Sequence, residues 1–255
     1  MIVLKSTREL ALMREAGRIV ATLLQELKAQ VRPGVTTGEL DRVAARVLKQ
    51  HGATSPFYNY PNHVRSQRPF PGMICTSVNE ELVHGIPGKR ALREGDIIKI
   101  DCGATFKGWI ADSAWTFPVG QISPEAQRLL EVTEGALYAS IAAARPNNRT
   151  GDMSAALQQF VEERDFNVVR EYTSHGVGRH LHEDPQVPNV GAPGRGAKLR
   201  PGMTIAVEPM VLAGNYKTRV LSDQWTVAAK DGKLTAHFEH TIAITDGEPD
   251  ILTRL

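Results

Sequence analysis

Residues 98–113 read IKIDCGATFKGWIADS, and this stretch decides the fold. It consists of two β-rich runs that meet at residues 106–108, which predicts a β-hairpin with one carboxylate on each strand. With a two-residue loop, Asp101 and Asp112 share one face, directly opposite or diagonally related, with side chains roughly 5 to 8 Å apart. A three-residue loop places them on opposite faces unless a bulge restores the register.

Two carboxylates that face each other among apolar neighbours need a positive partner. The hairpin alone leaves three candidates open: a basic side chain, a proton shared by the pair, or a metal ion. Taken singly, a strand aspartate is more often a turn former or a salt-bridge partner. Cys102 follows Asp101 on the same run, so it points to the other face and is predicted to lie in the core.

Length and composition are typical of an ordinary globular protein. The 255 residues predict a single domain, 42% of them are hydrophobic, and a net charge of +2 gives no support for a nucleic-acid partner. Only two cysteines occur, Cys75 and Cys102, which fits free thiols in a reducing compartment. The first residues become charged too early for a signal peptide and no long apolar run follows, so we expect a cytoplasmic protein with no membrane partner.

Capping signals and apolar spacing predict four helices. Ser6 and Glu9 form a capping box, and the helix that they open ends before Arg32. The other three helices are expected to end near residues 52, 144 and 165, the third opening at Ser123-Pro124. Residues 53–72 predict a long irregular loop, residues 73–77 a short strand, and residues 236–244 one alternating strand with Glu239 inside it.

Two short patterns occur twice in the same order. Both helix-to-helix breaks read Arg-Pro, three residues, Thr-Gly, an acid and an apolar residue, and residues 92–101 resemble residues 199–208. Each of the latter segments ends an apolar strand in a carboxylate, Asp101 or Glu208. We therefore expect a duplicated α+β domain with pseudo-twofold halves of about 1–120 and 121–255. The site is expected at the junction, where Asp101 and Glu208 would face each other.

Five side chains from β-segments can form one metal-binding group. They are Asp101, Asp112, His175, Glu208 and Glu239. Four negative charges in one semi-buried site repel one another and favour proton uptake. Charge counting therefore favours two divalent cations over one, held by oxygen-rich ligands and one imidazole. Such a set suits Mn, Fe, Co or Zn without selecting among them.

The remaining histidines are harder to assign from local pattern. His84 precedes Gly85-Ile86-Pro87, and His182 follows a glycine-rich run; each is either a hydrogen-bonded loop residue or part of the site. The glycines between His175 and His182 exclude the helical histidine pair of the zincins. Structural roles are assigned to His51, His63, His180, His237 and His240.

Several longer motifs point to one family. In order, they are residues 75–80 (CTSVNE), 84–87 (HGIP), Ile100-Asp101, Asp112, residues 175–178 (HGVG) with His182, residues 208–210 (EPM), Trp225 and residues 239–241 (EHT). Over nearly its whole length the chain resembles methionine aminopeptidases of the bacterial type I class. The resemblance implies the pita-bread fold, in which helices cover a curved antiparallel sheet. It also implies removal of the initiator methionine from nascent polypeptides when the next residue is small.

The resemblance further implies a ligand set and a mechanism. Asp101 and Asp112 would bind one metal, His175 and Glu208 the other, with Asp112 and Glu239 bridging both. A hydroxide between the two ions would attack the scissile carbonyl, and Glu208 corresponds to the family's general base.

Substrate contacts are implied in the same way. His84 and His182 correspond to histidines near the peptide nitrogen and the carbonyl oxygen. The methionine pocket would be lined by Cys75, Leu181, Trp225, Tyr58 and Tyr60. The implied partner is the N-terminal methionine of nascent chains, met by a monomer in transient contact with the ribosome.

The chain departs from the family pattern in two places. Leu181 stands where the family often has phenylalanine, and the loop over residues 55–72 is longer than in common members, with an Arg/Pro-rich insertion. Two other readings use the same scaffold. An Xaa-Pro aminopeptidase or prolidase usually carries an additional N-terminal domain, and a non-catalytic peptide-binding relative loses metal ligands.

Overall fold

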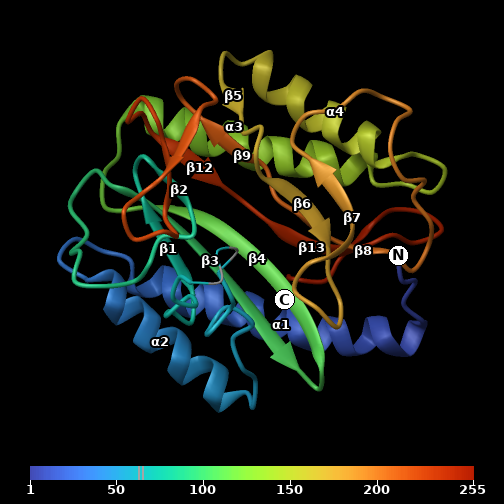
Figure 1. The fold of residues 1–255 in the computed structure, drawn as a ribbon, viewed down its shortest axis with the longest axis horizontal. Helices are drawn as coiled ribbons and strands as arrows, with labels where there is room; N and C mark the ends of the chain where they lie inside the picture. The colour runs from blue at the N-terminus through green and yellow to red at the C-terminus, as the bar shows by residue number, and fades with distance from the viewer. Residues whose placement is uncertain (63, 65) are drawn as a thin grey trace.

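The computed structural model describes residues 1–62, 64 and 66–255 (Figure 1). Within them the helices are α1 (Thr7–Gln30), α2 (Thr37–Gln50), α3 (Pro124–Ala143) and α4 (Thr150–Glu162). These are the four helices that the capping and spacing patterns predict. His63, to which the sequence analysis gives a structural role, lies outside the described residues.

The strands pair antiparallel throughout the described ranges and form four small sheets. The first contains, in order, β1 (Cys75–Val78), β3 (Ile97–Phe106) and β4 (Trp109–Pro118). The next two contain β10 (Thr218–Val220), β11 (Val227–Ala229) and β2 (Glu81–Val83), and then β12 (Thr235–His237), β9 (Met210–Leu212) and β5 (Asn167–Val168). The fourth contains β14 (Asp250–Ile251), β13 (His240–Ala243), β8 (Thr204–Val207), β6 (Thr173–Gly176) and β7 (Glu183–Pro188).

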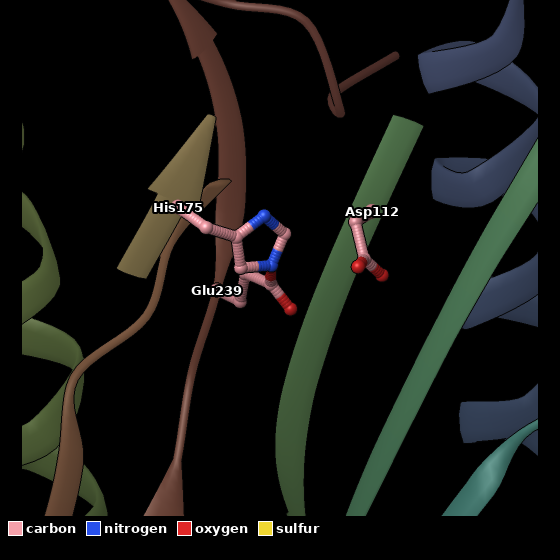
Figure 2. A group of neighbouring side chains, drawn as sticks. All are labelled: Asp112, His175 and Glu239. Atoms are coloured by element: carbon pink, nitrogen blue, oxygen red, sulfur yellow. The ribbon is translucent and has the colours of Figure 1, made fainter. Parts of the chain in front are cut away.

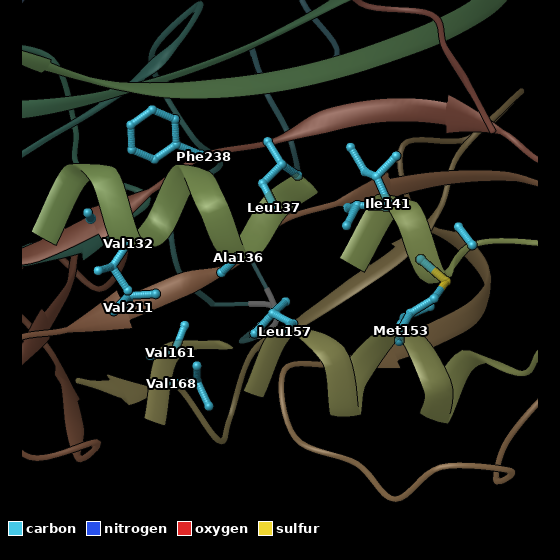
Figure 3. Close-up of a cluster of buried hydrophobic side chains, with 14 of the residues drawn as sticks. Val132, Ala136, Leu137, Ile141, Met153, Leu157, Val161, Val168, Val211 and Phe238 are labelled. Atoms are coloured by element: carbon cyan, nitrogen blue, oxygen red, sulfur yellow. The ribbon is translucent and has the colours of Figure 1, made fainter. Parts of the chain in front are cut away.

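Helices cover the strands from two sides. Figure 1 shows α1 and α2 along one side of the strands and α3 and α4 along the other. The residues drawn in Figure 3 show the second helix pair packing on strands, and include Val132, Ala136, Leu137 and Ile141 of α3, Met153, Leu157 and Val161 of α4, and Val168, Val211 and Phe238. This arrangement confirms the predicted α+β class. The division of one domain into two related halves stays a prediction.

Capping explains where the first two helices begin. The Ser6 hydroxyl accepts from the Glu9 N–H, and the Glu9 carboxylate accepts from the Ser6 N–H at 2.9 Å. Thr36 and Glu39 repeat the same reciprocal pair at the start of α2. No helix in the described residues combines the length and the apolar character needed to cross a membrane.

The acidic hairpin has the two-residue loop. Phe106 pairs with Trp109, and the loop residues Lys107 and Gly108 have φ values of 50° and 76°, the left-handed backbone that such a tight hairpin turn requires. Asp101 then lies opposite Ala114, and Asp112 opposite Gly103, so the two carboxylates are diagonal neighbours on one face. Cys102 packs in the core beneath α1 and α2, as alternation predicts.

The expectation of a single strand over residues 236–244 is wrong. β12 pairs with β9 and β13 pairs with β8, and Glu239 lies between these two strands. The backbone of Glu239 bonds sideways to β4 instead: its N–H donates to the Ala114 carbonyl at 2.7 Å, and its carbonyl accepts from the Ser113 hydroxyl at 2.5 Å. An alternating pattern cannot reveal this change of partner, because the alternation of side chains between the two faces does not depend on which strand is the neighbour.

Buried threonines extend this contact into a seam between β4 and residues 237–241. The Thr241 hydroxyl accepts from the Asp112 N–H at 2.9 Å and donates to the Asp112 carbonyl at 2.8 Å. Thr116 makes the same double contact with the backbone of His237, at 2.7 and 3.0 Å. Side chains that pair with backbone groups 121 to 129 residues away therefore place Asp112 beside Glu239.

Lys99 makes a second long-range contact between the strands that carry these acids. Its buried ammonium donates to the Asn79 carbonyl at 2.6 Å and to the Thr235 carbonyl at 3.0 Å. Burial lowers the pKa of Lys99 to about 7. The contact joins β3, which carries Asp101, to β12, which leads to Glu239.

Replacing Thr241 with valine tests the seam. Thr241→Val keeps the shape but removes both hydrogen bonds to the Asp112 backbone, so we expect the free energy of unfolding to fall by about 1–3 kcal/mol. Urea denaturation measures the change. Thr22→Val, at a partly exposed position in α1, is the matched control and should shift stability by no more than about 0.5 kcal/mol. Equal effects at the two positions would show that the seam is not a special source of stability.

Candidate metal centre

A cavity of about 610 Å³ opens where β3 and β4 meet strands from the later part of the chain. Its walls are formed by Phe57, Tyr60, Phe70, Cys75, Val83, His84, Asp101, Asp112, Glu171, Tyr172, Thr173, His175, Leu181, His182, Glu183, Asp184, Gln186, Glu208, Met210, Trp225, His237 and Glu239. Every site residue that the sequence predicts lies in this wall, with one exception.

The exception is Tyr58, whose expected place in the pocket is wrong. Half of Tyr58 is exposed, whereas Phe57 before it is buried and lines the cavity. Asn59 then has a φ of 62°, which turns the chain so that Tyr60 comes back to the cavity wall. Composition of the loop could not show which aromatic side chains face inward, because the loop has no regular period.

The five predicted ligands come from five β-segments. Asp101 lies in β3, Asp112 in β4 and His175 in β6, while Glu208 directly follows β8 and Glu239 joins β12 to β13. Ligand atoms of Asp112, His175 and Glu239 all lie within 4.8 Å of one another. Figure 2 shows the imidazole of His175 and the carboxylate of Glu239 approaching a common space from one side, with Asp112 on the other.

The tautomer of His175 follows from its neighbour. Its Nδ1 lies 2.8 Å from the Gly176 carbonyl oxygen, which only accepts, so Nδ1 carries the hydrogen. Burial, and then the neighbouring His182, lowers the pKa of His175 to about 3, so the ring is neutral. Its Nε2 therefore presents a lone pair 3.4 Å from Oε1 of Glu208, and the contact is not an ion pair.

The carboxyl groups are short of positive charge. Burial raises the pKa of Asp101, Asp112, Glu208 and Glu239, and repulsion by neighbouring carboxylates adds to the shift at three of them. In the part of the chain that the structure describes, Oδ1 of Asp101, Oδ1 of Asp112 and Oε1 of Glu239 are buried without a hydrogen-bond partner. Unpartnered buried acceptors are costly, and cations remove that cost. Carboxylate oxygens with one imidazole nitrogen are a donor set that fits divalent metal ions.

His84 and His182 lie beside this cluster. His84 has a φ of 60°, and its ring packs edge-on against Tyr172 with centroids 5.9 Å apart. The following Gly85 is required, because a Cβ there would lie 2.1 Å from the Thr76 carbonyl oxygen. The ring of His182 lies 4.4 Å from that of His175, and its Nδ1 lies 2.6 Å from the Tyr60 hydroxyl.

His237 is a site residue that the sequence analysis missed. It is 1% exposed and lines the cavity, and its Nε2 lies 3.4 Å from Oε2 of Glu208. Burial lowers its pKa to about 3, and neither ring nitrogen has a hydrogen-bond partner among the described residues. The available signal was its spacing: two residues before Glu239 in an alternating run, it shares the face of that acid.

Comparisons with known proteins agree with this geometry. The model of metallopeptidase family M24 matches residues 11–246. Methionine aminopeptidase 1 of Bacillus subtilis is 54% identical over 255 residues, and the match covers 100% of both chains.

Solved structures give the same result. A crystal structure of methionine aminopeptidase from Thermotoga maritima superposes with a TM-score of 0.96, at 41% identity and with 100% of both chains covered. The Xaa-Pro dipeptidase of Bacillus anthracis shares the fold, with a TM-score of 0.79 at 21% identity, and this chain covers 62% of it. The chain therefore belongs to metallopeptidase family M24 and, within it, to the methionine aminopeptidases.

Proposed function

We propose that this protein is an exopeptidase that removes the N-terminal methionine from nascent polypeptides whose second residue is small. The observation that carries the proposal is the cavity, where five ligand-type side chains converge and three buried carboxylate oxygens lack a hydrogen-bond partner. The relatives that match the chain over its full length are supporting evidence, since they are named for this activity.

The metal assignment is part of the proposal. Asp101, Asp112, His175, Glu208 and Glu239 would together hold two divalent ions. The ions are drawn from Mn, Fe, Co and Zn, which all accept carboxylate oxygen and imidazole nitrogen. When bound, they polarise the scissile carbonyl and make water a nucleophile near neutral pH. The neutral, Nδ1-protonated state of His175 supports this role, because it leaves the Nε2 lone pair available.

The chain's own side chains supply the proton transfers. Glu208 acts as the general base that accepts a proton from the attacking water, and its place in the cavity wall supports this role. His84 donates toward the peptide nitrogen and His182 toward the carbonyl oxygen. Both line the cavity beside the carboxylates, which supports a role for both in contacting the substrate.

The cavity wall suits a methionine side chain. Cys75, Leu181 and Trp225 line it together with further apolar residues, and Cys75 and Leu181 are buried. Leucine in place of the family's frequent phenylalanine keeps this wall apolar. The carboxylates at the inner end attract a free α-ammonium group, which an internal peptide bond lacks, so cleavage is restricted to the first residue.

The proposal also covers the setting. The protein works in the cytoplasm as a monomer, in transient contact with the ribosome, where nascent chains emerge. Two free buried cysteines, Cys75 and Cys102, support a reducing compartment.

Peptide cleavage tests the substrate. The manganese-loaded enzyme should hydrolyse Met-Ala-Ser at least ~100-fold faster than Xaa-Pro peptides, measured as kcat/KM by release of the first residue. Enzyme treated with a chelator is the control and should be inactive toward both peptides. Faster cleavage of Xaa-Pro peptides would reject the methionine substrate and leave the metal centre standing.

Removing the charge of one ligand carboxylate tests the metal centre. Asp112→Asn takes away a negative charge and one of the two carboxylate oxygens that would bind the ions. Changes around metal ligands alone cost about 10–100-fold in affinity, so we expect a larger loss of Mn²⁺ affinity and a parallel loss of cleavage. Calorimetric titration with Mn²⁺ measures it. Glu171→Gln removes a carboxylate from the same cavity wall outside the cluster, and its affinity should be unchanged. Full Mn²⁺ affinity in Asp112→Asn would contradict the assignment.

His84 should affect turnover without affecting the metal. His84→Ala removes a donor to the reacting peptide, so kcat should fall by about 10²–10⁴-fold while Mn²⁺ affinity stays constant. His51→Ala, at the exposed end of α2, is the control and should change neither quantity. Equal losses of turnover and affinity would identify His84 as a ligand instead.

A further inference from the structure

One contact in the cavity joins two residues that lie 122 positions apart in the chain. The Tyr60 hydroxyl lies 2.6 Å from Nδ1 of His182, and the two rings meet edge-on with centroids 5.4 Å apart. Tyr60 therefore contacts Nδ1 of His182, which leaves Nε2 as the nitrogen that can face a substrate.

The long loop holds Tyr60 in place on both sides. The Tyr60 N–H donates to the Phe57 carbonyl at 2.8 Å, and the Tyr60 carbonyl accepts from the Phe70 N–H at 2.9 Å. Phe70 packs edge-on against Trp225, with ring centroids 5.3 Å apart. These contacts fix the backbone of Tyr60, and the contact with His182 gives the direction of its hydroxyl.

The insertion in this loop is itself anchored to the turn before β11. The Trp225 indole N–H donates to the Arg68 carbonyl at 3.0 Å, and the Gln67 amide donates to the Gln224 side chain at 2.7 Å. The Arg/Pro-rich insertion of the loop is therefore tied to the same turn that holds Trp225, next to Tyr60.

The direction of the hydrogen bond determines the tautomer of His182. Burial raises the pKa of Tyr60, so the phenol keeps its hydrogen at neutral pH. An imidazole nitrogen is a better acceptor than a phenolic oxygen, so the hydroxyl donates to Nδ1. A neutral imidazole that accepts at Nδ1 carries its hydrogen at Nε2, and only that nitrogen can then donate to a carbonyl oxygen.

We propose that Tyr60 is a positioning residue whose hydroxyl holds His182 as the Nε2–H tautomer, aimed at the carbonyl oxygen of the scissile peptide. This inference rests on the proposed function for the identity of that peptide. It gives Tyr60 a role beyond lining the methionine pocket, because its ring serves the pocket and its hydroxyl serves the reaction.

Nitrogen-15 NMR of the zinc-loaded enzyme tests the tautomer without any substrate. With labelled histidine, and with His182→Ala used to assign the signals, wild-type His182 should show an unprotonated Nδ1 and a protonated Nε2. Tyr60→Phe keeps the ring and should lose this single tautomer, giving a mixture. Tyr216→Phe, at an exposed position, should match wild type. An Nδ1–H tautomer in wild type, or an unchanged His182 in Tyr60→Phe, would overturn the proposal.

A double-mutant cycle tests the link to turnover. On Met-Ala-Ser, Tyr60→Phe should lower kcat about tenfold, the size of one hydrogen bond, and leave KM within about twofold. In a His182→Ala background, the same change should have no further effect. An equal loss of kcat in both backgrounds would show that Tyr60 acts independently of His182 and would refute the role. If wild type does not cleave Met-Ala-Ser, the proposed function fails, and the NMR result still decides the Tyr60–His182 contact.

Discussion

Four buried carboxyl groups share one cavity, and the rest of the structure depends on how their repulsion is balanced. Asp101, Asp112, Glu208 and Glu239 would each be easier to bury if protonated, as their raised pKa values show. The lysine nearest to them in the sequence, Lys99, is already committed to carbonyl oxygens behind β3. Divalent cations, which the metallopeptidase family implies, would supply the missing positive charge, and binding them would stabilise the folded state by mass action.

The scaffold resists this repulsion with hydrogen bonds that carry no net charge. The seam between β4 and residues 237–241 uses hydroxyl groups of Ser113, Thr116 and Thr241 to join backbone segments that lie 121 to 129 residues apart in the chain. Each of these hydrogen bonds is buried, so a hydrogen bond that is lost cannot be replaced by one to water at low cost. Asp112 and Glu239 are consequently held by their backbone positions, and their side chains remain available to ligands.

Much of this arrangement could be predicted from local sequence, because local rules produce it. Capping boxes predict where α1 and α2 begin, and a two-residue turn puts Asp101 and Asp112 on one face. The features that could not be predicted depend on contacts outside the local sequence. Nothing near Glu239 in the sequence shows that its backbone bonds to β4, and nothing near Tyr58 shows that its neighbours, and not Tyr58 itself, face the cavity. Residue type and charge suffice to group the five candidate ligands, whereas their distances and directions depend on the fold.

The turn at Lys107 and Gly108 has a consequence for how the sequence can change over time. Adjacent residues of β4 alternate between the cavity and the core, so inserting one residue in the turn would shift the pairing by one position and exchange the two faces. Asp112 would then point into the apolar layer under α1. The two-residue turn therefore cannot absorb a one-residue insertion without exchanging the two faces of β4.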